Sequence, residues 1–161
     1  MNAIQVDLMT TLPEMLVLGM AMFILLLDLF LKSNHRIAIY VLAQVTLLGA
    51  AFITFSTQTP AVGYAFNGMF VDDPLSDVLK LMIYLSTSVM LVYTRGYITL
   101  RGMFCGEFYA LALFAMLGMM IMVSGQHFLT LYMGLELLSL CLYTLVALDR
   151  DNPRASEAAM K

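Results

Sequence analysis

The sequence has few charged residues, few cysteines and no concentration of positive charge. Only 12% of its 161 residues are charged, and the net charge of −3 is spread along the chain. Without a basic stripe we expect no binding of nucleic acid. The two cysteines, Cys105 and Cys141, lie in no metal-binding or redox spacing. We therefore expect free thiols and no disulfide framework.

The sequence also lacks the motifs of an enzyme that makes or breaks bonds by itself. It has no glycine-rich phosphate loop, no cluster of cysteine and histidine, and no nucleophile spaced from a base. We therefore expect this chain to bind no cofactor and to carry no redox centre.

Apolar residues, in contrast, are abundant and occur in long runs. They make up 61% of the chain, and the mean hydropathy is +0.89, which is typical of a membrane protein. About 20 helical residues cross the roughly 30 Å hydrocarbon core of a bilayer. Five runs meet this requirement, at residues 12–31, 37–55, 75–93, 108–123 and 127–148. The predicted fold is all-α, a polytopic bundle of transmembrane helices.

The positive charges alternate between the two sides of these predicted helices. They follow the first, third and fifth helices, as Lys32, Arg36, Arg95, Arg101, Arg150 and Arg154. The N-terminus and the connections at 56–74 and 124–126 contain neither Lys nor Arg. Because Lys and Arg favour cytoplasmic loops, we expect the N-terminus to lie outside.

Residues typical of helix starts support these limits. Thr11 followed by Glu14 resembles a capping box, and Asp73 followed by proline resembles an N-cap with a proline in the first turn. The same Asx-Pro pattern recurs at residues 152–153 and predicts a sixth helix from about residue 153. Only about two turns of it precede Lys161, so we expect this sequence to be part of a longer protein.

Two acidic residues have a lysine one turn away. Asp28 lies four residues before Lys32, which predicts an ion pair at the inner end of the first helix. Asp77 and Lys80 predict a similar pair near the outer surface. Alternatively, Lys80 reaches inward toward Glu136, since the two residues differ in depth by only roughly 5 Å.

Glu136 is the strongest candidate for a functional residue. It lies near the middle of the apolar run 127–148, where a charged carboxylate costs about 2.5–3.5 kcal/mol on insertion scales. A helical repeat places it on one stripe with Tyr132, Ser139 and Tyr143. We interpret Glu136 as a proton relay. Burial favours the protonated form of such a carboxyl group and a movable cation favours the charged form, so the group can take up and release a proton. The alternative is a purely structural hydrogen bond.

Several segments of the C-terminal third resemble a known family. They are Gly-Glu-Phe-Tyr at 106–109, Ser-Gly-Gln-His-Phe-Leu at 124–129, Leu-Tyr-Met-Gly-Leu-Glu-Leu at 131–137, Leu-Tyr at 142–143, and Ser-Glu-Ala-Ala-Met-Lys at 156–161. The chain is similar here to the subunit N family of bacterial NADH:quinone oxidoreductase, respiratory complex I, which is related to the Mrp-type sodium/proton antiporter subunits. A looser similarity covers residues 71–80.

The resemblance implies a role in the membrane arm of that complex, in the inner membrane of a bacterium. NADH oxidation elsewhere in the complex drives protons outward there, and NADH, FMN, iron–sulfur clusters and quinone belong to other subunits. The implied partners are the other membrane-arm subunits, the lipid bilayer and protons. Residues 1–105 would supply three leading helices, and residues 106–161 the start of the antiporter-like repeat.

The resemblance also implies roles for individual residues. Glu136 matches the family carboxylate of the proton path, whose partner lysine would lie on a later helix, beyond residue 161. Lys161 matches a family lysine at the start of the sixth helix, with a lesser role that includes packing or steering charge. Lys80 is a further candidate. We do not expect this piece of the family sequence to pump by itself.

Two other functions fit the same sequence. In the first, the helices form a structural membrane scaffold, and Glu136 satisfies a hydrogen-bond donor of a neighbour. In the second, the chain is a small proton-coupled exporter that works as an oligomer with Glu136 as its carboxylate switch. The predicted sixth helix, broken off at Lys161, argues against the exporter.

Overall fold

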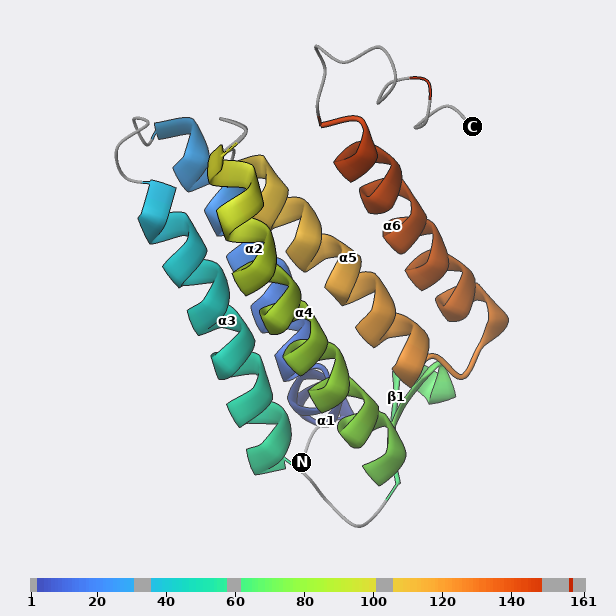
Figure 1. Ribbon diagram of the computed structural model, residues 1–161. Helices are drawn as coiled ribbons and strands as arrows, with labels where there is room; N and C mark the ends of the chain where they lie inside the picture. Colours follow the sequence, from blue (N-terminus) through green and yellow to red (C-terminus); the bar gives the residue numbers. More distant parts are fainter. Residues whose placement is uncertain (1–2, 31–35, 58–61, 101–105, 149–156, 158–161) are drawn as a thin grey trace.

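Five long helices make up most of the part of the chain that the structure describes, as the sequence predicts. The computed structural model describes residues 3–30, 36–57, 62–100, 106–148 and 157. The long helices are α2 (Leu12–Phe30), α3 (Arg36–Thr57), α4 (Pro74–Leu100), α5 (Gly106–Ser124) and α6 (Phe128–Val146), which run side by side in alternating directions (Figure 1). Each is long and apolar enough to cross a membrane. The all-helical class and the five spans are therefore confirmed.

One helix is longer than its apolar run. We expected the third span to end at residue 93, whereas α4 continues to Leu100. The polar sequence Thr-Arg-Gly after residue 93 suggested an end, but Arg95 packs its guanidinium carbon 4.7 Å from the centre of the Tyr40 ring. This cation–π contact with α3 supports the additional turns. The predicted sixth helix lies outside the described residues, apart from Glu157.

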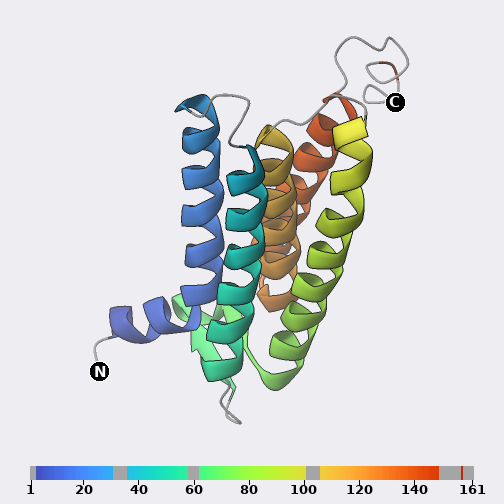
Figure 2. The ribbon, with the colours of Figure 1, turned by 60° about the vertical axis from the view of Figure 1, so that its left-hand side comes forward.

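Two small elements lie at one end of the bundle and were not predicted. A short helix, α1 (Ala3–Thr10), lies across the base of α2 (Figure 2). An antiparallel hairpin joins α3 to α4 and consists of β1 (Gly63–Ala65) and β2 (Phe70–Asp72). Its turn, η2 (Phe66–Gly68), has three successive residues with positive φ. We call this part of the molecule the hairpin end.

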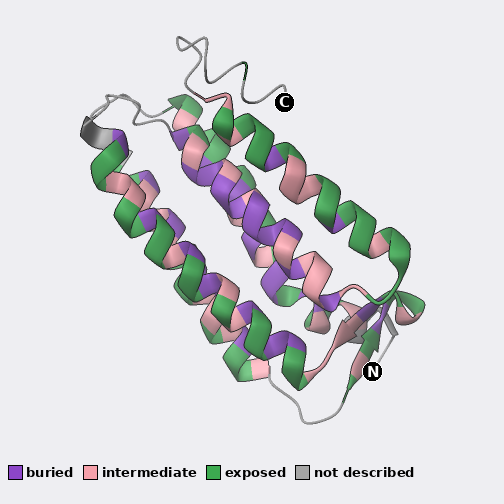
Figure 3. Cartoon of the chain, turned by 45° about the vertical axis from the view of Figure 1, so that its right-hand side comes forward, coloured by how far each residue is buried: buried purple, intermediate pink, exposed green. Residues whose placement is uncertain are grey.

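Burial is uneven among the five helices. α5 lies at the centre of the bundle, and 56% of the residues in its most apolar 18-residue stretch are buried. The corresponding share for α6 is only 11% (Figure 3). Met116 and Met120 of α5 are completely buried and act there as packing groups. α6 therefore packs mainly on one side, against α5, and its other side faces away from the described helices.

The hairpin is attached to the turn between α5 and α6. Phe70 forms an isolated β-bridge with Gly125, and the amide of Gln126 donates to the carbonyl of Met69 at 3.1 Å. On its other side, the amide of Phe66 donates to the carboxylate of Asp7 at 3.2 Å. The hairpin thus links α1 to the start of α6.

Candidate functional site

Glu136 lies in the middle of α6, on the side that faces away from the bundle. Its side chain is exposed, and no described residue forms a hydrogen bond or ion pair with it. Tyr132 and Tyr143 are more than half exposed, and Ser139 of the same stripe is half-buried. The polar stripe predicted from the helical repeat is therefore turned away from the helices that the structure describes.

Two glycines determine which side of α6 faces α5. A Cβ atom added to Gly134 would lie 2.9 Å from the carbonyl oxygen of Gly118, and one added to Gly118 would lie 2.8 Å from that of Gly134. The two backbones therefore approach as closely as they do only because both residues lack a side chain. Glu136 follows Gly134 by two residues, about 200° around the helix, so its carboxylate points away from α5.

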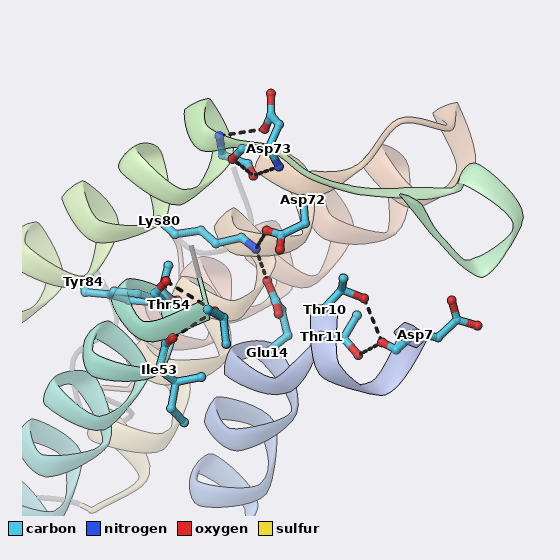
Figure 4. Close-up of polar contacts among 12 residues, drawn as sticks. Asp7, Thr10, Thr11, Glu14, Ile53, Thr54, Asp72, Asp73, Lys80 and Tyr84 are labelled. Carbon is cyan, nitrogen blue, oxygen red and sulfur yellow. Dashed lines mark hydrogen bonds and ion pairs between the residues drawn. The ribbon is translucent and has the colours of Figure 1, made fainter. Parts of the chain in front are cut away.

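A second polar group lies at the hairpin end, inside the protein. Lys80 of α4 is fully buried and extends between α2 and the hairpin (Figure 4). Its ammonium nitrogen is 2.8 Å from Glu14 Oε1 and 3.8 Å from Asp72 Oδ1. The same nitrogen lies 5.1 Å from the centre of the Phe70 ring. Side chains from α2 and β2 thus converge on one lysine of α4.

This arrangement differs from both predictions for Lys80. The lysine neither pairs with Asp77 at the surface nor reaches Glu136; its ion-pair partners are Glu14 and Asp72. Spacing along one helix identifies neighbours at i+3 and i+4, but it does not show which other helix a side chain meets. One signal in the sequence was overlooked: Lys80 is the only Lys or Arg between Arg36 and Arg95. It is therefore the only Lys or Arg that this stretch of sequence offers to the carboxylates at 72, 73 and 77.

The predicted capping box of α2 is also wrong. The Thr11 hydroxyl donates to the carbonyl of Asp7 at 2.8 Å, and the Thr11 amide donates to the same carbonyl at 3.3 Å. Because α1 directly precedes α2, its carbonyls are close to Thr11 and Glu14 is not needed for capping. Glu14 is free to turn inward to Lys80.

The predicted N-cap of α4 is confirmed. Asp73 Oδ1 accepts a hydrogen bond from the amide of Ser76 at 2.8 Å, and Ser76 Oγ accepts one from the amide of Asp73 at 3.0 Å. These reciprocal bonds satisfy backbone donors at the start of the helix. One turn beyond Lys80, the hydroxyl groups of Tyr84 and Thr54 are 3.2 Å apart and link α4 to α3.

At the opposite end of the bundle, Asp28 packs against the start of α5. Its carboxylate lies so close to Gly106 that a Cβ there would collide with it. Asp28, Glu107 and Thr144 are the polar residues around a cavity of about 480 Å³ between α2, α5 and α6. The expected partner Lys32 lies outside the described residues, as does Lys161. Within the described ranges, no three His, Cys, Asp or Glu side chains are arranged to hold a metal ion.

Comparisons with known proteins agree on one family. Residues 125–161 match the family model described as NADH:quinone oxidoreductase/Mrp antiporter, TM. The whole chain is 73% identical to NADH-quinone oxidoreductase subunit N of Methylovorus glucosotrophus, of which it covers 34%. Over 93% of its length it is 55% identical to subunit N of Thiobacillus denitrificans, of which it covers 31%.

A solved structure shows the same fold. One chain of respiratory complex I from Thermus thermophilus with bound aureothin superposes with a TM-score of 0.73 at 26% sequence identity. The match covers 92% of the present chain and 31% of that chain. The present chain thus spans about one third of the relatives it matches. On sequence and fold together, it belongs to the subunit N family of NADH-quinone oxidoreductase.

Proposed function

We propose that this chain acts within an antiporter-like membrane-arm subunit of a proton-translocating NADH:quinone oxidoreductase, and that Glu136 carries protons there. Similarity along the whole chain to subunit N supports the assignment to the complex. The chain spans only about a third of such subunits, so the activity belongs to the longer protein, in assembly with the other membrane-arm subunits.

The position of Glu136 is the observation that carries the proton-relay proposal. The residue lies eight positions after Phe128 in a helix that ends at Val146, near the middle of an apolar span. Its side chain faces away from the described helices. A carboxylate at that depth is costly unless it meets a cation, water or a proton. A partner from the rest of the protein would complete such a site on the exposed side of α6.

The other assignments follow from the same proposal. A lysine on a later helix is the expected partner of Glu136, and Lys161 is a secondary candidate near the start of the sixth helix. The N-terminus and the hairpin end lie outside the cell membrane. The C-terminal ends of α2 and α4 lie on the cytoplasmic side of the bacterial inner membrane. Residues 106–161 begin the antiporter-like repeat. NADH, FMN, iron–sulfur clusters and quinone are bound by other subunits.

The test is proton translocation driven by NADH in membrane vesicles that carry the full-length protein in its assembled complex. We expect Glu136→Gln to reduce proton translocation at least several-fold, and Glu136→Asp to restore most of it, because aspartate keeps the ionisable group. Asp7→Asn is the matched control. It makes the same chemical change at a residue outside the spans, and the amide oxygen still accepts from Phe66.

The competing scaffold function predicts a different result. If Glu136 only satisfies a neighbour's donor, the glutamine variant either pumps normally or loses the complex altogether. Quantifying the assembled complex in the same vesicles separates these cases. Normal pumping by both Glu136 variants in a fully assembled complex would refute the relay.

A further inference from the structure

The buried group around Lys80 contains more acids than bases. Glu14 is 7% exposed, Asp77 is 4% exposed and Lys80 is completely buried. Asp72 is half-buried beside them, within 3.8 Å of the lysine nitrogen. Asp77 lies close enough to both Asp72 and Lys80 to interact with them electrostatically. Three carboxyl groups therefore share one ammonium group.

No other cation among the described residues compensates for this excess. The elements packed around the group contribute hydroxyls, from Thr54 and Tyr84, and a further carboxylate, Asp73, which is occupied as the cap of α4. α1 contributes Asp7, whose carboxylate accepts from the hairpin backbone. Isolated buried carboxylates are strongly disfavoured, and they become acceptable when they are paired or neutral.

A second, independent observation concerns hydrogen bonding. Glu14 Oε2 is buried and has no hydrogen-bond partner in the described part of the chain, although Oε1 contacts Lys80. Ser124 Oγ, at the end of α5 next to the Gly125–Phe70 bridge, is also buried without a described partner. Buried polar atoms without a partner normally mark a place for a water molecule, an ion or a proton.

We propose that Glu14, Asp72, Asp77 and Lys80 form a proton-binding site at the hairpin end, separate from Glu136. A proton taken from water forms an O–H bond on one of the three carboxyl groups and reduces the net charge of the site from −2 to −1. The new hydroxyl donates a hydrogen bond to a neighbouring carboxylate. A metal cation fits less well, because these carboxylates are not arranged as three ligands around one point.

Infrared difference spectroscopy tests this proposal in the purified complex, without turnover. The carbonyl stretch of a protonated carboxyl group is distinct from that of a carboxylate, and it shifts in heavy water. We expect a pH-dependent protonated-carboxyl signal that is lost in Glu14→Gln, Asp72→Asn or Asp77→Asn. We expect Lys80→Met to gain one such signal, because removal of the ammonium group leaves the excess negative charge larger.

Asp73→Asn is the matched control, since it makes the same chemical change one residue from Asp72 and keeps an oxygen that can cap α4. Its spectrum should equal that of the unmodified complex. If a change at Glu14 prevents assembly, Asp77→Asn still tests the site, because Asp77 has no ion pair with Lys80 within 4 Å. A spectrum unchanged in every variant, or a signal that responds to sodium rather than to pH, would overturn the proposal. The result is independent of pumping through Glu136.

Discussion

At the scale of single residues, Glu136 and Lys80 show what a sequence does and does not reveal. The depth of Glu136 in its helix follows directly from residue counting, and the structure agrees. The partners of Lys80 do not follow, because they come from α2 and from a hairpin more distant than one helical turn. Helical spacing specifies neighbours on the same helix only. Contacts between helices depend on packing that the sequence pattern leaves undetermined.

The ion pair between Lys80 and Glu14 makes a prediction about stability. Removing one member of a buried pair leaves the other charge uncompensated, so Lys80→Met should lower the free energy of unfolding by about 3 kcal/mol. The double variant Lys80→Met with Glu14→Gln should recover part of this loss, because it returns the net charge of the group formed by residues 14, 72, 77 and 80 to its original value. Unfolding of the full-length protein is followed by the reactivity of the buried thiol Cys141, with Cys105 changed to Ser. A double variant less stable than Lys80→Met would contradict the assigned pair.

At the scale of elements, the long helices were predictable and the small ones were not. An apolar run of about 20 residues identifies a span without any knowledge of its neighbours. The strands β1 and β2 have three residues each, too few to show an alternating pattern. Their turn, with Phe66 and Asn67 at positive φ, contains Asn67 followed by Gly68, a pair that is typical of hairpin turns. The sequence therefore offered one signal for the turn, whereas the pairing of the two short strands follows only from the structure.

The glycine contact between α5 and α6 makes a prediction for these elements. Gly134→Ala would place a methyl group 2.9 Å from the carbonyl oxygen of Gly118. Backbone atoms have little freedom to yield, so we expect a loss of about 1–3 kcal/mol and a displaced α6. Gly49→Ala in α3 is the matched control, since a Cβ there meets nothing within 4 Å. Thermal unfolding of the full-length protein measures both variants, and equal midpoints would contradict a close helix contact.

At the scale of the whole molecule, acidic groups gather at the hairpin end, and the chain is largely free of basic residues there. Lys80 is buried inside this end and so does not contribute to its surface. In the sequence, the remaining Lys and Arg residues lie near or after the C-terminal ends of α2, α4 and α6. This polarity is the basis of the proposed orientation, and it could be recognised from the sequence because loop charge needs no tertiary contacts.

Chemical labelling tests the orientation. Tyr64 is 58% exposed on the hairpin, so Tyr64→Cys should react with a membrane-impermeant maleimide added to intact spheroplasts. Asn34→Cys, in the connection after α2, should react only after the membrane is opened. Both substitutions are made in the full-length protein with Cys105 and Cys141 replaced by Ser. Labelling of position 34 but not 64 in intact spheroplasts would reverse the orientation.

The attachments of α6 limit how Glu136 can move. The turn just before its start is joined to the hairpin through the bond from Gln126 to Met69, and its middle is held against Gly118 through Gly134. A helix held at two points along its axis resists both sliding and tilting. The carboxylate then moves by rotation of its own side-chain bonds, which takes picoseconds to nanoseconds. In a relay through Glu136, the slow event would therefore be the arrival of a proton or the movement of a partner, rather than a displacement of the helix.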